Sequence, residues 1–172
     1  MTIERAEAFD FWGKRTLVGP QLKPGDTAPD FTLINDKFQF IQRHDLSGKP
    51  MLISVVPSLD TAVCSMQTAR FDQEAANFGD SITVVTVSAD LPFAQKRWCG
   101  DHNITNSVVL SDHREMSFGA AYGTLVKDLR IESRAVFVVD ANGVVQYAEY
   151  VPLAGSHPDY VAVLEALQDV VK

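Results

Sequence analysis

The apolar positions in the middle of the chain change from a continuous run to a helical spacing. Residues 51–56 read MLISVV, which is typical of a buried strand, and the run ends at Pro57. After a turn, apolar residues recur at helical spacing, at Cys64, Phe71, Ala75 and Phe78. Because such positions share one face of a helix, the pattern predicts a strand, a turn and an amphipathic helix with the thiol in its first turn.

The same patterns predict further elements on either side of this unit. Strands are expected at residues 16–20, 31–34, 38–41, 82–87, 107–110 and 134–140. Helices are expected from Asp90, as a possible N-cap, to a point before Gly100, over residues 115–122, and from Pro158 onward. Asn142-Gly143, between two strand-like runs, is a strong signal for a tight hairpin turn.

This alternation of strands and helices, closed by a hairpin, predicts an α/β fold. Its sheet should be of mixed direction, with helices on both faces. Residues 1–15 contain three aromatic side chains but no long periodic pattern, so we expect them to form a peripheral N-terminal arm. Residues 16–172 would then form a single domain, which is the usual number for a chain of this length.

Charge and composition exclude several classes of partner. The net charge is −7, and the acidic and basic residues are interspersed without a basic block, so nucleic acid and anionic membranes are not expected partners. The first residues include acids and no apolar core of a signal peptide, and no run approaches the ~20 apolar residues of a membrane span. We therefore expect a cytoplasmic protein, in which the two cysteines are more often redox-active than structural.

The position of Cys64 suggests a chemical role for its thiol. Unpaired N–H groups and the positive end of the helix dipole stabilise an anion at a helix N-terminus, which favours the nucleophilic thiolate over the thiol. The alternative is a small buried apolar side chain that happens to begin a helix, because free cysteine is among the most buried residue types. The position alone does not decide between the two.

The local sequence does distinguish them. Residues 57–64 read PSLDTAVC, which resembles the active-site signature of the peroxiredoxins and, within them, the form found in bacterial thiol peroxidases. The resemblance continues through GDTAPDF at residues 25–31, ADLPFAQKRWCG around Cys99, SRAVFVVDANG around Arg134 and HPDY near the C-terminus. It implies a thioredoxin-like fold, with a mixed sheet flanked by helices and strand or hairpin additions at the N-terminus.

The resemblance also implies roles for particular residues in a thiol-dependent peroxidase. Cys64 would be the peroxidatic nucleophile and Cys99 the resolving cysteine, joined to it in an intramolecular disulfide. Thr61 and Arg134 would donate to the peroxide, and Arg134 would add a cation beside the sulfur. Pro57 would shape the pocket. Thr61 could instead cap the helix, and Arg134 could simply be a charged residue at the start of a strand.

The implied reaction reduces hydrogen peroxide and organic hydroperoxides, with thioredoxin as the reductant, in a homodimer without a metal or other cofactor. The chain departs from the family pattern at IESRAV, where Glu132 could compete for Arg134 as an ion-pair partner.

Cys99 and His102 have the spacing of a zinc-ligand pair, but no second close pair accompanies them. The chain has no C-x-x-C motif of a disulfide oxidoreductase. A cysteine hydrolase would need a histidine that the sequence does not place, and a non-enzymatic redox-sensing or interaction module is the remaining alternative.

Overall fold

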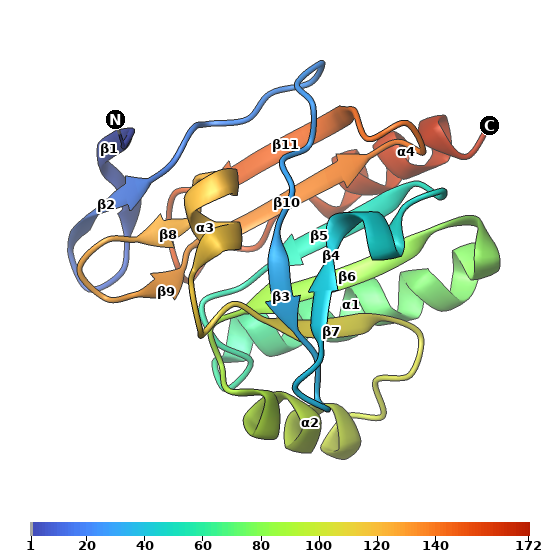
Figure 1. Cartoon of the computed structure of the whole chain (residues 1–172), viewed down its shortest axis with the longest axis horizontal. Helices are drawn as coiled ribbons and strands as arrows, with labels where there is room; N and C mark the ends of the chain where they lie inside the picture. The colour runs from blue at the N-terminus through green and yellow to red at the C-terminus, as the bar shows by residue number, and fades with distance from the viewer. Residues whose placement is uncertain (1) are drawn as a thin grey trace.

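A seven-stranded mixed sheet forms the centre of the protein in the computed structural model, which describes residues 2–172 (Figure 1). Across the sheet the strands are β11 (Val145–Val151), β10 (Arg134–Val139), β5 (Met51–Val55), β6 (Thr83–Ser88), β7 (Val108–Ser111), β3 (Thr32–Ile34) and β4 (Phe40–Gln42). The three central strands β5, β6 and β7 are parallel, and the strands on both sides of them are antiparallel to their neighbours. The expected mixed sheet is confirmed.

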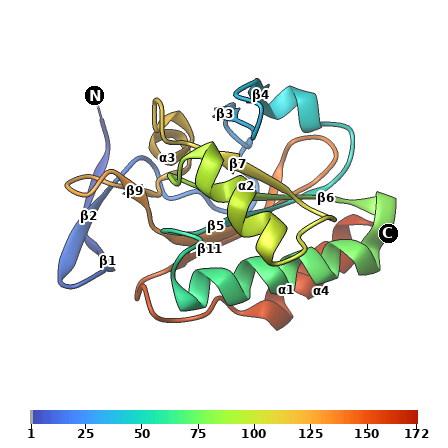
Figure 2. The ribbon, with the colours of Figure 1, turned by 90° about the horizontal axis from the view of Figure 1, so that it is seen from below.

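Both faces of the central strands are covered, which explains why β5 reads as a continuous apolar run (Figure 2). Leu52 packs on one face with side chains of α1 (Ala62–Phe78) and α4 (Tyr160–Val170). Ile53 and Val55 pack on the other face with α3 (Ser117–Tyr122) and the segment that leads into β3. A further helix, α2 (Pro92–Asp101), packs against β7.

The N-terminal residues form a second, smaller sheet. Its strands, in order, are β1 (Glu4–Asp10), β2 (Lys14–Val18), β8 (Leu125–Val126) and β9 (Ile131–Glu132). The boundary that we expected after residue 15 therefore falls inside β2, and the expected arm contributes β1 and the start of β2 to this sheet. Neither β8 nor β9 was predicted from the sequence, because two residues are too few to produce a periodic pattern.

Several predicted boundaries differ from the observed ones. Asp90 is not the N-cap of α2: that position is Leu91, with Pro92 as the first helical residue, and α2 continues past Gly100 to Asp101. The short 3₁₀ helices η1 (Arg43–Leu46) and η2 (Gly79–Ser81) were not predicted. The hairpin at Asn142-Gly143 is confirmed, since it joins β10 to β11. None of the helices in residues 2–172 is long and apolar enough to cross a membrane.

Candidate active site

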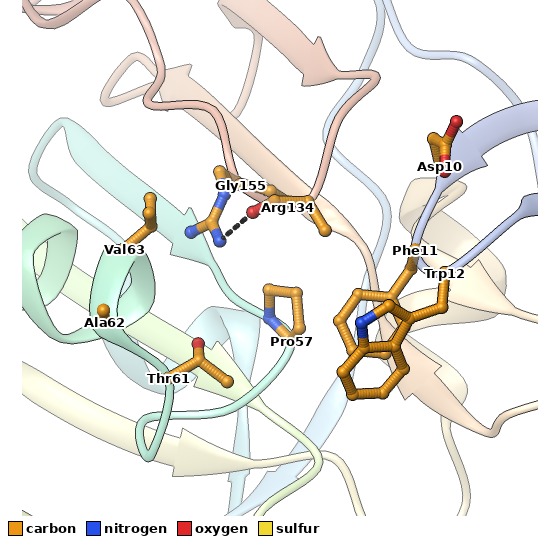
Figure 3. Close-up of a pocket in the computed structure, with 10 residues that line it drawn as sticks. Asp10, Phe11, Trp12, Pro57, Thr61, Ala62, Val63, Arg134 and Gly155 are labelled. Atoms are coloured by element: carbon orange, nitrogen blue, oxygen red, sulfur yellow. Dashed lines mark hydrogen bonds between the residues drawn. The ribbon is translucent and has the colours of Figure 1, made fainter.

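A pocket of about 350 Å³ opens where the first turn of α1 faces the start of β10 and the turn between β1 and β2 (Figure 3). Its lining residues are Asp10, Phe11, Trp12, Pro57, Thr61, Ala62, Val63, Arg134, Ala154 and Gly155. These come from four segments that are distant in the sequence. Three of the five predicted site residues, Pro57, Thr61 and Arg134, therefore lie around one cavity.

The turn between β5 and α1 gives the pocket one of its walls. Asp90 holds this turn, because its carboxylate accepts hydrogen bonds from Ser58 Oγ at 2.7 Å and from the Leu59 amide at 2.8 Å. Pro57 lies just beyond the end of β5 and lines the pocket. The sequence did not reveal this role of Asp90, because the residues it holds are about thirty positions earlier in the chain.

Cys64 is the third residue of α1, so its thiol is in the first helical turn as predicted. The side chain is completely buried and does not itself line the pocket. No side chain caps the start of this helix, and the N–H groups of its first turn keep their capacity to donate. A sulfur anion at this position would lie in the favourable field of the helix N-terminus.

Arg134 connects the pocket to the buried thiol. Its Nη2 donates to Cys64 Sγ at 3.3 Å and to the Ala154 carbonyl at 2.7 Å, and its Nη1 donates to Gln67 Oε1 at 2.9 Å. Arg134 is only 1% exposed. The guanidinium is thus held in one orientation, with a nitrogen in contact with the sulfur and an edge that lines the pocket.

The groups around the Arg134 guanidinium determine how its positive charge is balanced. A buried guanidinium stays protonated, and a buried charge is costly unless it is paired. Among residues 2–172, no carboxylate forms an ion pair with Arg134, and its other acceptors are a carbonyl and an amide oxygen. The other acceptor of Nη2 is the Cys64 sulfur, so the cation lies directly beside the thiol.

Gln67 and Ser54 belong to the site but were not identified from the sequence. Both side chains are completely buried, and Gln67 Nε2 donates to Ser54 Oγ at 2.8 Å. Because Gln67 is three residues after Cys64, the two side chains share a helix face, and this spacing was the available signal. The chain from Ser54 on β5 through Gln67 on α1 fixes Arg134 on β10.

Thr61 lines the pocket, but its hydroxyl does not contact the sulfur in this structure. Thr61 Oγ1 donates to the Ser58 carbonyl at 2.9 Å, and the residue occupies the N-cap position without making a side-chain cap. The hydroxyl proton is therefore used within the turn, and the lone pairs of the oxygen remain available.

Glu132 does not compete for Arg134. Glu132 is the last residue of β9, and its carboxyl group is completely buried, where it accepts from Thr124 Oγ1 at 2.5 Å and approaches Asp112. Burial, and then the hydrogen bond and negative charge of Asp112, raise the pKa of Glu132 well above its usual value. Burial also raises the pKa of Asp112, which accepts from the amides of Phe118 and Gly119.

Cys99 lies in the last turn of α2 and is half-buried. It packs against the small cluster that contains Cys64 and Trp98, but its side chain lines a separate pocket, and both cysteines are free thiols. Burial, together with the negative charges of Asp72 and Asp36, raises the pKa of the Cys99 thiol to about 11. At neutral pH this thiol is protonated while α2 is folded.

The possible zinc pair is not built as a metal site. The His102 ring stacks on Trp98 with centroids 4.2 Å apart, and His102 Nδ1 lies 2.9 Å from the Trp98 carbonyl oxygen. No group of three histidine, cysteine or carboxylate side chains that could hold a metal ion occurs within residues 2–172.

Comparisons with known proteins place these features in a family context. Residues 23–164 match the redoxin family. The chain is 52% identical over 160 residues to the thiol peroxidase of Bacillus subtilis, covering 93% of this chain and 95% of that protein. It is 52% identical to the thiol peroxidase of Listeria innocua over 151 residues, covering 88% and 91% of the two chains. The crystal structure of a peroxiredoxin-like protein from Aquifex aeolicus superposes with a TM-score of 0.85 at 37% identity, over 92% of this chain and 93% of that one.

Proposed function

The chain belongs to the redoxin family and is a thiol-dependent peroxidase of the peroxiredoxin group, and from this premise we propose how its residues carry out the reaction. Cys64 attacks the peroxide, and Arg134 orients it and stabilises the charge that develops. The contact of 3.3 Å between Arg134 Nη2 and Cys64 Sγ carries this proposal, because it pairs a buried nucleophile with a buried cation that also lines the pocket.

The step is a two-electron oxidation of sulfur. The Cys64 thiolate attacks the terminal oxygen of a peroxide ROOH, a sulfur–oxygen bond forms and the oxygen–oxygen bond breaks. The sulfur becomes a sulfenic acid, and the leaving RO⁻ takes a proton to become ROH. The positive charge of the Arg134 guanidinium and the N–H groups of the first turn of α1 would stabilise the negative charge on the oxygens in the transition state. R is hydrogen for hydrogen peroxide or a carbon group for an organic hydroperoxide.

Thr61 acts as an acceptor for the incoming peroxide, and not as the donor that the family resemblance implied. Its hydroxyl proton is donated to the Ser58 carbonyl, so its oxygen can accept the proton of the terminal peroxide oxygen. This would orient the peroxide with the terminal oxygen toward the sulfur. Pro57 also lines the pocket, where it covers the peroxide next to Thr61 and limits the access of water.

Cys99 resolves the sulfenic acid in the next step. Its thiolate attacks the Cys64 sulfur and forms the disulfide, the sulfur–oxygen bond breaks, and the hydroxide that leaves takes up a proton to become water. In the folded helix, the pKa of about 11 makes the thiolate about a hundredfold rarer than at the ordinary value of 9.0. Unwinding of the last turn of α2 would expose Cys99 to water, restore its reactivity and bring it to Cys64.

We assign re-reduction of this disulfide to a thioredoxin, whose dithiol supplies the two electrons in the cytoplasm. A homodimer is the assembly that we assign to the chain, because two-fold dimers are the commonest closed assemblies and the family resemblance favours one. Light scattering should then give twice the monomer mass of 18.9 kDa at micromolar concentration. A monomer at that concentration would refute the assignment.

Replacement of Cys64 tests the nucleophile. Cys64→Ser should keep the fold, because the hydroxyl is of similar size, and should reduce neither hydrogen peroxide nor an organic hydroperoxide. Peroxide consumption is measured with thioredoxin and its reductase, with circular dichroism as the control for folding. Turnover at the wild-type rate would exclude Cys64 as the nucleophile.

Replacement of Cys99 separates the two chemical steps. Cys99→Ser should still consume one equivalent of peroxide, but turnover with thioredoxin should be lost and the Cys64 sulfenic acid should persist or overoxidise. Mass spectrometry of peroxide-treated wild type should show a loss of two hydrogens in a linked Cys64–Cys99 peptide pair. A disulfide between subunits, or a free Cys99 in the oxidised protein, would contradict the resolving role.

A further inference from the structure

The turn between β1 and β2 carries an aromatic side chain to the mouth of the active-site pocket. Trp12 lines the pocket and is 89% exposed, and its ring centroid lies 4.5 Å from that of Phe11 (Figure 3). Both residues precede the range 23–164 that matches the redoxin family. This wall of the pocket is therefore supplied by a segment outside the part of the chain that defines the family.

The turn is fixed to the catalytic residues by main-chain hydrogen bonds. The Asp10 amide donates to the Pro152 carbonyl at 2.7 Å, and the Ala154 amide donates to the Asp10 carbonyl at 3.0 Å. Ala154 in turn accepts from Arg134 Nη2 at 2.7 Å. The position of the turn relative to Arg134 is thus set by three consecutive hydrogen bonds.

Side-chain contacts hold the turn from its other side. Arg15 donates from Nε to the Phe11 carbonyl at 3.0 Å and from Nη2 to the Trp12 carbonyl at 3.3 Å. Phe11 also packs against a small buried cluster that contains Phe9. Phe11 is therefore anchored in the fold. The indole of Trp12 is mostly exposed and lies at the mouth of the pocket.

The fold gains little from Trp12 itself. Its backbone has φ of +49°, a left-handed conformation that is unfavourable for a bulky residue, and most of its ring stays in water. A single exposed apolar side chain needs no explanation, but this ring continues an apolar surface formed by Phe11, Pro57 and Val63 around the pocket. An apolar ligand that enters the pocket would bury this surface.

The size of the pocket indicates what such a ligand is. A water molecule takes about 30 Å³ of liquid volume, so a hydrogen peroxide molecule would occupy only a small part of the 350 Å³. Ligand pockets for small organic molecules begin at about 300 Å³ and are lined mainly by apolar and aromatic side chains. The cavity is therefore large enough for the carbon group of an organic hydroperoxide beside the peroxide oxygens.

We propose that Trp12 is a specificity-determining residue that packs against the organic group of an alkyl or aryl hydroperoxide while the peroxide oxygens lie at Arg134. This rests on the proposed function, in which Cys64 attacks the peroxide beside Arg134. Hydrogen peroxide has no organic group, so its reduction does not depend on the ring. The indole thus raises the rate for apolar hydroperoxides selectively.

The test compares two peroxides in variants that suit the local backbone. Trp12→Asn removes the ring and places a residue that tolerates left-handed φ, and Trp12→Phe keeps an aromatic ring. Phe38→Asn is the matched control, because Phe38 is also an exposed aromatic residue with left-handed φ, at +59°, but does not line the pocket. Rates of consumption of cumene hydroperoxide and of hydrogen peroxide are measured with enzyme in excess, so that the reductant does not contribute.

Trp12→Asn should slow the reaction with cumene hydroperoxide about tenfold, in line with the loss of one aromatic contact, and should change the rate with hydrogen peroxide less than twofold. Trp12→Phe and Phe38→Asn should keep the wild-type ratio of the two rates. An unchanged ratio in Trp12→Asn, or an equal loss with both peroxides, would overturn the proposal. A change of molecular mass in light scattering of Trp12→Asn would also overturn it, by assigning the ring to a subunit contact.

The design separates this inference from the proposed function. If Cys64→Ser retained peroxide reduction, the nucleophile would be wrong whatever Trp12 did. If Cys64→Ser were inactive and the Trp12 variants kept the wild-type ratio, the nucleophile would stand and the role of Trp12 would be rejected.

Discussion

Arg134 and Glu132 are two residues apart and equally buried, but the protein treats their charges in opposite ways. Arg134 keeps its charge, and its two terminal nitrogens donate to a sulfur, a carbonyl and an amide oxygen. Glu132 meets a second carboxyl group, Asp112, and burial raises the pKa of both acids. One region retains a buried cation and the other favours protonation of its acids.

The difference shows how burial can serve chemistry in one place and packing in another. A guanidinium does not lose its proton in a protein, so the cost of burying it must be offset by acceptors, and here these include a sulfur. A carboxyl group can escape the cost by taking up a proton. The pair of acids then serves packing, because Asp112 accepts from the Gly119 amide of α3 and Glu132 of β9 accepts from Thr124. The packing is close: a Cβ atom added at Gly119 would lie only 2.8 Å and 2.9 Å from the Glu132 oxygens.

Removal of the cation should have the largest effect on peroxide reduction. Arg134→Met keeps much of the apolar volume but removes the donors to the sulfur and the peroxide. We expect about a hundredfold loss in the rate of peroxide reaction, which is the usual cost of one preorganised donor. Arg134→Lys should recover only part of the rate, because an ammonium group cannot reproduce the planar fork that contacts Gln67 and Cys64 together.

Stopped-flow measurement of peroxide reaction, together with the rate of Cys64 alkylation across pH, checks this expectation. Arg70→Met is the control, since Arg70 is an exposed arginine on the same helix as Cys64. If Arg134→Met folded normally and reacted at the wild-type rate, Arg134 would have only a structural role.

The sequence pointed to Cys64 and Arg134 as residues of the site, but not to Gln67 and Ser54, which hold Arg134 in place. Cys64 and Arg134 lie in motifs that the chain shares with its family, and the helical pattern placed the thiol in the first turn of α1. The contact between them joins residues 70 positions apart, so no local pattern could have shown it. For the same reason the sequence suggested Glu132 as a partner of Arg134, whereas Glu132 faces Asp112.

The fold was predicted where elements are long and apolar. β5, β6 and β10 are continuous buried runs, and each was expected within one residue of its observed ends. β8 pairs with β2, which is distant in the sequence, and β9 pairs with β8, so both short strands are set by pairing rather than by their own composition. The pairing of β1 with β2 shows the same limit, because their register includes an irregularity that obscures alternation.

A smaller effect on rate should follow from loosening Arg134 without removing it. Gln67→Leu removes the acceptor of Arg134 Nη1 and the donor to Ser54 Oγ. We expect the rate of peroxide reaction to fall about tenfold, since a hydrogen bond to a charged group is worth about 1.5–3 kcal/mol and only part of this concerns the transition state. Because Gln67 acts through Arg134, alkylation of Cys64 should require a higher pH than in wild type, as it should in Arg134→Met, but by a smaller amount.

Gln168→Leu is the matched control, since Gln168 is an exposed glutamine on α4. The double variant Arg134→Met/Gln67→Leu should react no more slowly than Arg134→Met alone. Additive losses in the double variant would show that Gln67 affects the rate independently of Arg134.

The smallest effect on peroxide reduction, and a distinct effect on stability, should come from the acid pair. The pKa of Glu132 is raised in the folded protein, so the folded state holds a proton that the unfolded state releases above its ordinary pKa of 4.5. The stabilisation is therefore complete below that value and is lost as the pH rises through the folded pKa. For one proton the free energy of unfolding falls by at most about 1.4 kcal/mol per pH unit in this window. Urea unfolding of wild type at a series of pH values above 5 should show this decline.

Glu132→Gln should flatten that decline, because the amide keeps the shape of the carboxyl group and cannot ionise. Glu165→Gln, at an exposed glutamate on α4, should leave the decline as in wild type. The rate of peroxide reaction should change less than twofold in Glu132→Gln, since Glu132 contacts Thr124 and Asp112 rather than Arg134. A loss of rate comparable to that of Gln67→Leu would show that the two buried regions are coupled through β10, and the contrast between them would then fail.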